Sequence, residues 1–301
     1  MSSSRLFTDT TDFMAIEYGD QILVDGERYT VTGVERERRF GIEDPKHWVK
    51  RVVHSGTGER KIIKLSYFET FEATLGEVKI RCFRDPQKEA DILNLVKHHP
   101  SFMHGYSFSD PRGNNIRVLD IVRGANFLIY LNSLRMPHDL YFHKTLPGIL
   151  SKLVTAFEAI RFLHDHGFRH GDIRNDHLMV AQQSGEYVWI DFDYDYDSME
   201  NPFGLDIFGL GNILCYAVGK GFHNLYMIQN DSFTYGDLFE RVTPEDMSIL
   251  HKTRFMNLKK LYPYIPGMLN NILMHFSMNT TIYYEFIDEM LEDLKGYLRS
   301  L

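Results

Sequence analysis

The hydrophobic pattern changes its period near Gly124, and this change limits the folds open to the chain. Before that point, segments such as 28–34 and 60–67 carry β-branched residues in the alternating pattern of strands. After it, segments such as 145–167 and 204–221 carry apolar residues at helical spacing. The sequence therefore predicts an α+β fold with two lobes, a β-rich one and a helical one, and a ligand cleft between them.

The same pattern suggests where the parts of the chain begin and end. We expect residues 1–20 to form a polar N-terminal arm, residues 21–122 the N-terminal lobe and residues 123–301 the helical C-terminal lobe. The stretch HSGTGE at 54–59 predicts a hairpin turn, because its glycines can adopt a positive φ. The stretch NNIRVLDIVRG, residues 114–124, predicts a strand that ends at its glycine.

One helix is expected directly before that strand. Asp85 is a candidate N-cap and Pro86 takes the first helical position, where its missing N–H is no loss. Apolar residues then follow at helical spacing, and Glu89 falls in the first turn. The sequence thus places a carboxylate near the start of a helix that follows the strands.

Composition excludes several classes of protein. The 301 residues are 44% hydrophobic and 25% charged, which is typical of a soluble globular protein, and no apolar run is long enough to span a membrane. The net charge of −8 disfavours nonspecific nucleic-acid binding. Cys82 and Cys215 lie too far apart to suggest a metal knuckle or a disulfide framework. We therefore expect a cytoplasmic protein with neither nucleic-acid nor membrane partners.

Two aspartates at the ends of secondary-structure elements point to chemistry. Asp172 lies in HDHGFRHGDIRNDHLMV, residues 164–180, after a long predicted helix. Asp191 follows the apolar run YVWI. Either residue alone is explained as the cap of a turn. Together with Lys64 at the end of a strand, they favour a site for a metal and a proton acceptor.

The order and spacing of five motifs resemble the protein-kinase superfamily over residues 29–298. Agreement of five motifs in the correct order is far less frequent by chance than agreement of one. The resemblance implies a two-lobed protein-kinase-like fold. The motifs are IIK at 62–64, KEADILNLVKHHP at 88–100, the stretch 164–180, VWIDFD at 188–193 and DIFGLGNIL at 206–214.

This resemblance implies roles in phosphoryl transfer for five side chains. Asp172 would accept or orient the acceptor hydroxyl, and Asp191 would hold Mg²⁺, with Mn²⁺ as the other possible cation. Lys64, paired with Glu89, would contact the phosphates of ATP. Arg174 matches the lysine that neutralises the transferred group.

The resemblance also implies an adenine site. Leu119, Asp120 and Ile121 match the hinge, whose backbone would bind the base. Met179 would pack beneath the base, although an ordinary core methionine explains it equally well.

Several positions depart from the family pattern in the metal-binding part. His177 replaces an asparagine that ligates a second metal, and a neutral imidazole is a poor ligand for Mg²⁺. Asp193 is a candidate compensating ligand, because IDFDY resembles the IDFEY of choline and ethanolamine kinases and relatives of the aminoglycoside-kinase type. The alternative for Asp193 is a place in a solvent-facing acidic loop.

Other departures concern the loops. Only Gly41 remains where the phosphate-covering loop of the family has several glycines. Gly171 replaces the arginine that reads a phosphorylated activation loop, and the segment between Asp191 and Asp206 is about half the family's length. Control by loop phosphorylation is therefore not expected.

Three functions fit these observations. The first is an ATP- and Mg²⁺-dependent kinase whose acceptor is a protein Ser/Thr hydroxyl or a small molecule. The second is a pseudokinase that acts as a nucleotide-binding or scaffolding module. The third is a metal-dependent hydrolase built on His170, Asp172, His177 and Asp191, although His170 fits better as the histidine that organises the loop.

Overall fold

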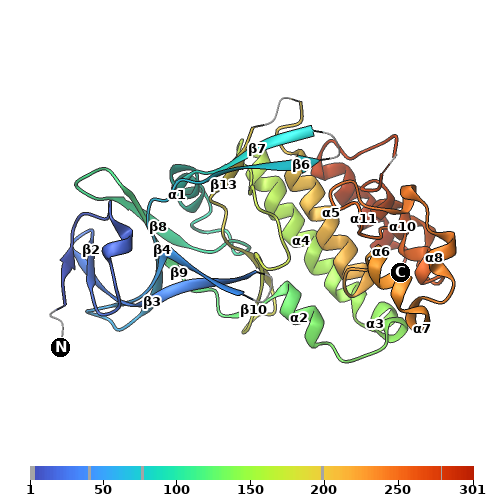
Figure 1. Cartoon of the computed structure of the whole chain (residues 1–301), viewed down its shortest axis with the longest axis horizontal. Helices are drawn as coiled ribbons and strands as arrows, with labels where there is room; N and C mark the ends of the chain where they lie inside the picture. Colours follow the sequence, from blue (N-terminus) through green and yellow to red (C-terminus); the bar gives the residue numbers. More distant parts are fainter. Residues whose placement is uncertain (1–3, 40–41, 76–77, 198–199, 279) are drawn as a thin grey trace. The chain divides into compact units, whose positions relative to one another are not determined.

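The structure, a computed structural model, describes residues 4–39, 42–75, 78–197, 200–278 and 280–301. The chain divides into two compact units. Unit 1 comprises Met1–Thr70 and Phe83–Arg123, and unit 2 comprises Phe71–Cys82 and Gly124–Leu301. Strands are the main secondary structure of unit 1 and helices that of unit 2, so the mixed α+β class predicted from the sequence is confirmed (Figure 1).

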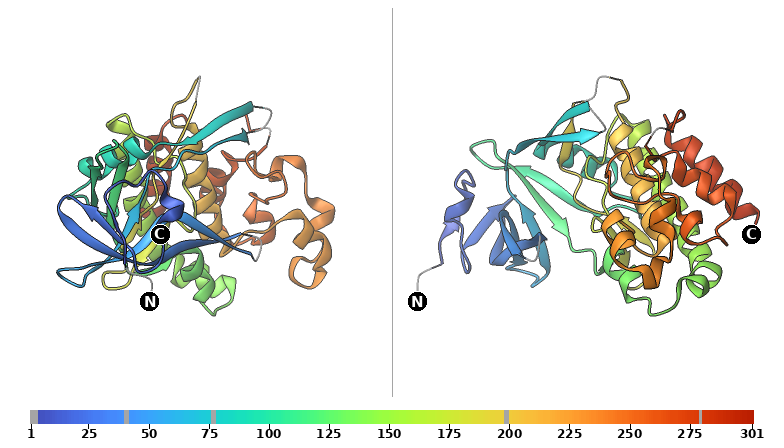
Figure 2. Two further views of the ribbon diagram at one scale, coloured as in Figure 1. Left: turned by 60° about the vertical axis from the view of Figure 1, so that its left-hand side comes forward. Right: turned by 45° about the vertical axis from the view of Figure 1, so that its right-hand side comes forward.

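Unit 1 is built on a curled seven-stranded sheet with the order β1-β2-β3-β4-β5-β9-β8 (Figure 2). All neighbouring strands are antiparallel except the pair β1 and β2, which is parallel. The strands are β1 (Leu6–Phe7), β2 (Gln21–Val24), β3 (Glu27–Arg39), β4 (Ile42–His54), β5 (Arg60–Lys64), β8 (Gly105–Ser109) and β9 (Asn115–Asp120).

The apolar core of unit 1 includes the segment before the first long strand. Ile16 is 2% exposed and packs in one cluster with Val31, Val52 and Ile63 of the sheet. Residues 1–20 were expected to form a polar arm, but this part of the chain contributes β1 and the short helix η1 (Phe13–Ala15) to unit 1.

Two local predictions in unit 1 are confirmed. The hairpin between β4 and β5 turns where the glycine-containing stretch predicts it, with the N–H of Gly58 donating to the carbonyl of His54. Helix α1 (Pro86–Leu95) begins after Asp85, whose side chain accepts hydrogen bonds from the N–H groups of Gln87 and Lys88.

The strand predicted at 114–124 is shorter than expected, because β9 ends at Asp120. Gly124 instead begins β10 (Gly124–Asn126), which pairs with β11 (Leu178–Ala181). A Cβ at this glycine would lie 2.0 Å from the carbonyl oxygen of Val180. The glycine therefore permits a close approach of two backbones rather than ending a strand.

Unit 2 contains two long helices that lie side by side, α4 (Leu146–Asp165) and α5 (Gly204–Gly219), with α11 (Ile287–Arg299) against α4 (Figure 1). Helices α4 and α5 lie where the helical spacing predicted them, and α10 (Gly267–Met274) packs against α11 and α5. The shorter helices in the described residues are α2 (Phe127–Ser133), α3 (His138–Lys144), α6 (Leu225–Asn230), α7 (Ser232–Tyr235), α8 (Leu238–Arg241), η2 (Pro244–Asp246) and α9 (Leu258–Leu261).

Two three-stranded sheets complete the fold. One has the order β10-β11-β12, with β12 at Tyr187–Trp189. The other has the order β13-β7-β6 and joins segments far apart in the sequence, β6 (Thr70–Leu75), β7 (Val78–Arg84) and β13 (Tyr194–Tyr196). None of the helices within the described ranges is long and apolar enough to cross a membrane.

Candidate active site

In unit 1, the structure brings together the lysine and glutamate that the sequence predicted as a pair. Lys64 is the last residue of β5, and its Nζ donates to Oε1 of Glu89 on α1 over 2.8 Å. The Nε of Arg117 on β9 donates to Oε2 of the same carboxylate over 3.0 Å. We call these three residues the Lys64 cluster.

All three side chains of the Lys64 cluster are buried. Glu89 is 0% exposed, Arg117 1% and Lys64 7%. Buried charges are tolerated only when they are paired and hydrogen-bonded, and here one carboxylate is shared by two cations. The cluster as a set therefore carries more positive than negative charge.

The sequence interpretation missed Arg117. This residue lies in the strand NIRVLD, whose apolar neighbours Ile116 and Val118 are buried. The ladder between β5 and β9 places it directly opposite Lys64, so both side chains project from the same face of the sheet. A basic residue at a position between buried apolar neighbours was the one available signal.

The predicted hinge residues lie at the end of β9. Leu119 is 3% exposed and pairs with Ile62 of β5. The N–H of Asp120 donates to the carbonyl of His104, and its carboxylate accepts from Nζ of Lys61 over 2.6 Å. Ile121 follows the end of the strand, and its side chain is exposed. The backbone N–H of Asp120 is thus already used by the fold.

In unit 2, the loop that carries Asp172 is fixed to helix α5 by one buried carboxylate. Asp206, in the first turn of α5, is 1% exposed. Its Oδ2 accepts from the N–H of His170 over 2.7 Å, and its Oδ1 accepts from the N–H of Gly171 over 2.9 Å. His164 of α4 lies 3.1 Å from Oδ2 through its Nε2. These bonds tie α4 and the loop to one side chain of α5.

The environment of Asp206 favours its charged form. Burial by itself raises the pKa of a carboxyl group, but the hydrogen bond and charge of His164 and the N–H of Gly171 outweigh burial here. The pKa of Asp206 is therefore lowered from its ordinary value of 3.8. At neutral pH the carboxylate of Asp206 is therefore charged, and its hydrogen bonds hold the loop in place.

His177 brings together the two aspartates singled out from the sequence. Its Nδ1 lies 2.9 Å from the backbone carbonyl oxygen of Asp172 and 3.4 Å from Oδ2 of the same residue. A carbonyl can only accept, so Nδ1 carries a proton. Nε2, on the other side of the ring, lies 3.4 Å from Oδ2 of Asp191. One imidazole thus lies within 3.4 Å of both carboxylates.

Arg174 is held by its near neighbour in the loop. Its Nε and Nη2 donate to Asp176 over 3.0 and 2.7 Å, in a bidentate pair. Its Nη1 is 3.9 Å from Oδ2 of Asp172. We call Asp172, Arg174, Asp176, His177 and Asp191 the Asp172 cluster, which has three carboxylates, one guanidinium and one imidazole.

Burial raises the pKa of Asp172 above its ordinary value. The charges of His177 and Arg174 act against this shift, whereas the charges of Asp191 and Asp176 add to it. A carboxylate with a raised pKa is a better proton acceptor than an ordinary surface aspartate.

Asp191 has an unusual backbone conformation for a residue with a side chain. Its φ is +64°, in the left-handed region. The preceding residue, Ile190, donates its N–H to the carbonyl of His177 over 3.0 Å, which continues the pairing beyond β12. For a non-glycine residue, the left-handed conformation costs about 1 kcal/mol or more of free energy. Such residues are found most often at functional sites.

The acidic stretch after Asp191 does not face the solvent as a whole. Asp193 is 1% exposed, so the interpretation that placed it in a solvent-facing loop is wrong. Asp195 is partly buried and pairs with Arg169. Only Asp197 of these three is exposed. The residues that follow Asp193 pair with β7, and no local pattern in the sequence predicts that pairing.

The structure also describes Met179 and the two cysteines. Met179 lies on β11 opposite Val188 and Asn126 and is half-buried. Gly41, the remaining glycine of the expected phosphate-covering loop, lies outside the described residues. Cys82 and Cys215 are both buried and free.

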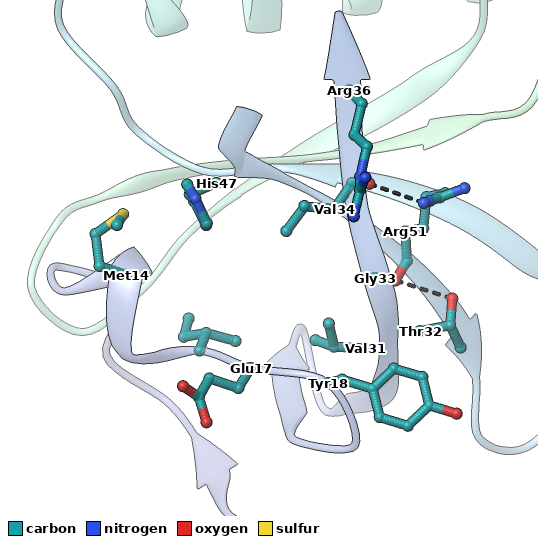
Figure 3. A pocket seen from close by; sticks show the side chains of 11 residues that line it. Met14, Glu17, Tyr18, Val31, Thr32, Gly33, Val34, Arg36, His47 and Arg51 are labelled. Atoms are coloured by element: carbon teal, nitrogen blue, oxygen red, sulfur yellow. Dashed lines mark hydrogen bonds between the residues drawn. The ribbon is translucent and has the colours of Figure 1, made fainter. Parts of the chain in front are cut away.

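A groove of about 720 Å³ in unit 1 contains none of the predicted site residues (Figure 3). It lies between the segment Met14–Tyr18 and strands β3 and β4. Its two arginines already have partners, Arg36 with Glu43 at 2.7 Å and Arg51 with the carbonyl of Val34 at 2.9 Å. Both guanidinium groups of the groove therefore already donate to acceptors within the protein.

Comparisons with known proteins add no family to these observations, since no family model and no curated protein matches the chain. Within the described ranges, no group of three or more His, Cys, Asp or Glu side chains is placed to hold a metal ion. The pair formed by His177 and Asp191 supplies one nitrogen and one oxygen donor.

Proposed function

We propose that this protein is an ATP- and divalent-metal-dependent phosphotransferase of the protein-kinase-like class, which moves the γ-phosphate to a hydroxyl acceptor. The observation that carries the proposal is the convergence of Asp172 and Asp191 on His177. One aspartate has a raised pKa, as a proton acceptor requires, and the other has a left-handed backbone beside a nitrogen donor.

The side-chain types of the two clusters favour the same function. Lys64 and Arg117 are cations of the kind that bind phosphate groups. Asp172, Asp176 and Asp191 supply carboxylate oxygens, which are the ligands that hard divalent cations prefer.

Two of the residues present offer donor atoms to a divalent cation, and His177 sets the preference between metals. Because Nδ1 carries the proton, a neutral ring turns the Nε2 lone pair toward Oδ2 of Asp191. Two electron-rich atoms at 3.4 Å are stabilised by a cation shared between them. Imidazole nitrogen suits Mn²⁺ better than Mg²⁺, which prefers oxygen donors. Asp191 and His177 would hold this cation, which when bound neutralises phosphate charge.

The chain's own residues perform the remaining tasks. Asp172 would accept the proton of the acceptor hydroxyl, and the bonds of Asp206 to the loop hold its backbone in place. Lys64, oriented by Glu89, would contact the phosphates. Arg174, fixed by Asp176, would contact the transferred group. The acceptor is a protein Ser/Thr or a small molecule.

Replacing Asp172 with Asn tests the proposal. We expect transfer of labelled γ-phosphate, measured to water, to the chain itself and to a serine-containing peptide mixture, to fall by about 10²–10⁴-fold. Binding of the metal–nucleotide should persist, since Asp172 is assigned to the acceptor.

Asp288→Asn is the matched control, because its carboxylate pairs with Arg161 on the surface of unit 2. This variant should transfer phosphate like the wild type. A wild-type protein that binds the metal–nucleotide but transfers no phosphate to any acceptor would contradict the proposed enzyme and support a scaffolding role. A wild type that binds no nucleotide would also contradict the proposed enzyme and would favour the scaffolding role.

A further inference from the structure

The segment that follows Asp191 is held in place by a strand from a distant part of the sequence. Strand β13 (Tyr194–Tyr196) forms the edge of the sheet β13-β7-β6. The pairing continues past its end, where the N–H of Asp197 donates to the carbonyl of Arg81 over 2.9 Å. Strands β6, β7 and β13 lie side by side (Figure 1).

One arginine binds the same segment from the side of the Asp172 loop. Nε of Arg169 lies 2.9 Å from Oδ1 of Asp195, and its Nη1 donates to the carbonyl of Tyr196 over 2.6 Å. Its guanidinium also lies over the ring of Tyr196, 4.5 Å from the ring centre. Oδ1 of Asp195 in turn accepts from the N–H of Tyr196 over 2.8 Å. Arg169 therefore contacts charge, backbone and ring of two adjacent residues.

Arg169 is well placed to connect two parts of the site. The next residue in the chain, His170, is fixed by its N–H to Asp206, and Asp172 follows two residues later. Asp195 lies four residues after Asp191. The pair of Arg169 and Asp195 thus joins the loop of one candidate site aspartate to the segment of the other.

We propose that Arg169 is a positioning residue, which with Asp195 and β7 keeps the segment after Asp191 ordered without any covalent modification. An arginine paired with a carboxylate supplies permanently the kind of contact that a phosphate group would supply conditionally. Tyr194 and Tyr196, the hydroxyl-bearing residues of β13, are 7% and 1% exposed, so neither is open to a modifying enzyme. The ordering itself is independent of nucleotide chemistry, and its role in keeping phosphotransfer constantly active rests on the proposed function.

Hydrogen exchange of the full chain, without nucleotide or metal, tests this inference. The variants Arg169→Gln and Asp195→Asn each remove the ion pair, and Asp195→Asn preserves side-chain size in case the arginine variant does not fold. We expect amide exchange over residues 191–197 to accelerate by about tenfold in both, as loss of a charge-assisted hydrogen bond predicts. The matched control is Arg161→Gln, which removes the pair with Asp288 at 2.8 Å and should leave these amides unchanged.

The reversed pair, Arg169→Asp with Asp195→Arg, should restore part of the protection that either single reversal removes. Unchanged exchange over 191–197 in Arg169→Gln and Asp195→Asn would overturn the inference. Acceleration spread equally over α4 and α5 would also overturn it, because Arg169 would then be a general stabiliser of unit 2. A wild type that binds no metal–nucleotide would remove the proposed function and leave the exchange result standing.

Discussion

The Lys64 cluster of unit 1 is buried and the Asp172 cluster of unit 2 is partly exposed, and the two combine charges in opposite proportions. In unit 1, Glu89 is shared by two cations, and all three side chains are almost fully buried. In unit 2, three carboxylates lie around one guanidinium and one imidazole, and Arg174 forms a bidentate pair with Asp176. Cations therefore outnumber carboxylates in the first set, whereas carboxylates outnumber cations in the second.

Residues of the same types can therefore have different roles in the two clusters. Removal of the Glu89 carboxylate strands two buried cations, so it should damage the fold. Removal of a carboxylate from the Asp172 cluster relieves repulsion among like charges, so it should damage binding more than folding. The first and third predictions below each test one side of this contrast.

The largest effect is expected for Glu89→Gln. Loss of the shared carboxylate should lower the free energy of unfolding by about 3–5 kcal/mol, since Lys64 and Arg117 would lose their buried counter-charge. Urea unfolding followed by tryptophan fluorescence measures it, with one reporter in each unit, Trp48 and Trp189.

Glu59→Gln is the control for this change. Its pair with Lys61 has a similar distance, 2.9 Å, but the Glu59 side chain is 62% exposed. The loss should stay below about 1 kcal/mol. Equal losses in the two variants would remove the contrast between a buried and an exposed pair.

The second effect concerns the charge of Asp206 and depends on pH. Because its pKa is lowered in the folded protein, its charge contributes stability that is present above the unfolded value and is lost as pH falls through the folded value. At neutral pH, Asp206→Asn should cost about 2 kcal/mol, since the hydrogen bonds to the N–H groups of His170 and Gly171 are charge-assisted.

Thermal unfolding of both proteins between pH 7 and strongly acidic pH checks this prediction. The difference between the wild type and Asp206→Asn should shrink as pH falls below the ordinary aspartate range. A difference that is constant over the whole series would show that the charge of Asp206 is not what holds the loop.

The third and smallest effect is a change of metal preference in His177→Asn. An amide oxygen in place of the imidazole nitrogen should lower the preference for Mn²⁺ over Mg²⁺ by about tenfold. Titration calorimetry with each metal in the presence of a non-hydrolysable ATP analogue measures the two affinities. The nitrogen assignment can also be read directly, because a coordinated imidazole couples to the electron spin of Mn²⁺, and that coupling should vanish in the variant. An unchanged preference would contradict a ligand role for His177.

Local sequence patterns predicted the elements whose causes are local. The N-cap Asp85, the turn at 54–59 and the helical spacing of α4 and α5 depend on near neighbours, and all of them are as expected. The pair of Lys64 and Glu89 was predicted because the strand and helix motifs that carry these residues resemble those of the protein-kinase superfamily.

The features that were missed depend on pairing across long sequence separations. Strand β13 pairs with β7 more than a hundred residues earlier, and neither segment contains a signal for the other. The contacts of Arg169 with Asp195 and Tyr196 also join segments more than twenty residues apart. Arg117 was missed because its partner Glu89 lies on a different element. The sequence shows only that Arg117 stands between two apolar residues, which the structure buries. The hydrophobic period of a segment indicates which of its faces is buried. It does not indicate which charged side chains meet on that face.

The most direct test of the account is metal-dependent nucleotide binding by the wild type, Lys64→Met and Asp191→Asn, measured by calorimetry with a non-hydrolysable ATP analogue and Mn²⁺. We predict that the wild type binds the analogue more tightly with the metal than without it. Lys64→Met should weaken binding under both conditions, because it removes a cation from the phosphates, whereas Asp191→Asn should remove only the gain that the metal brings. Binding of equal strength in all three proteins, or none in the wild type, would contradict the account.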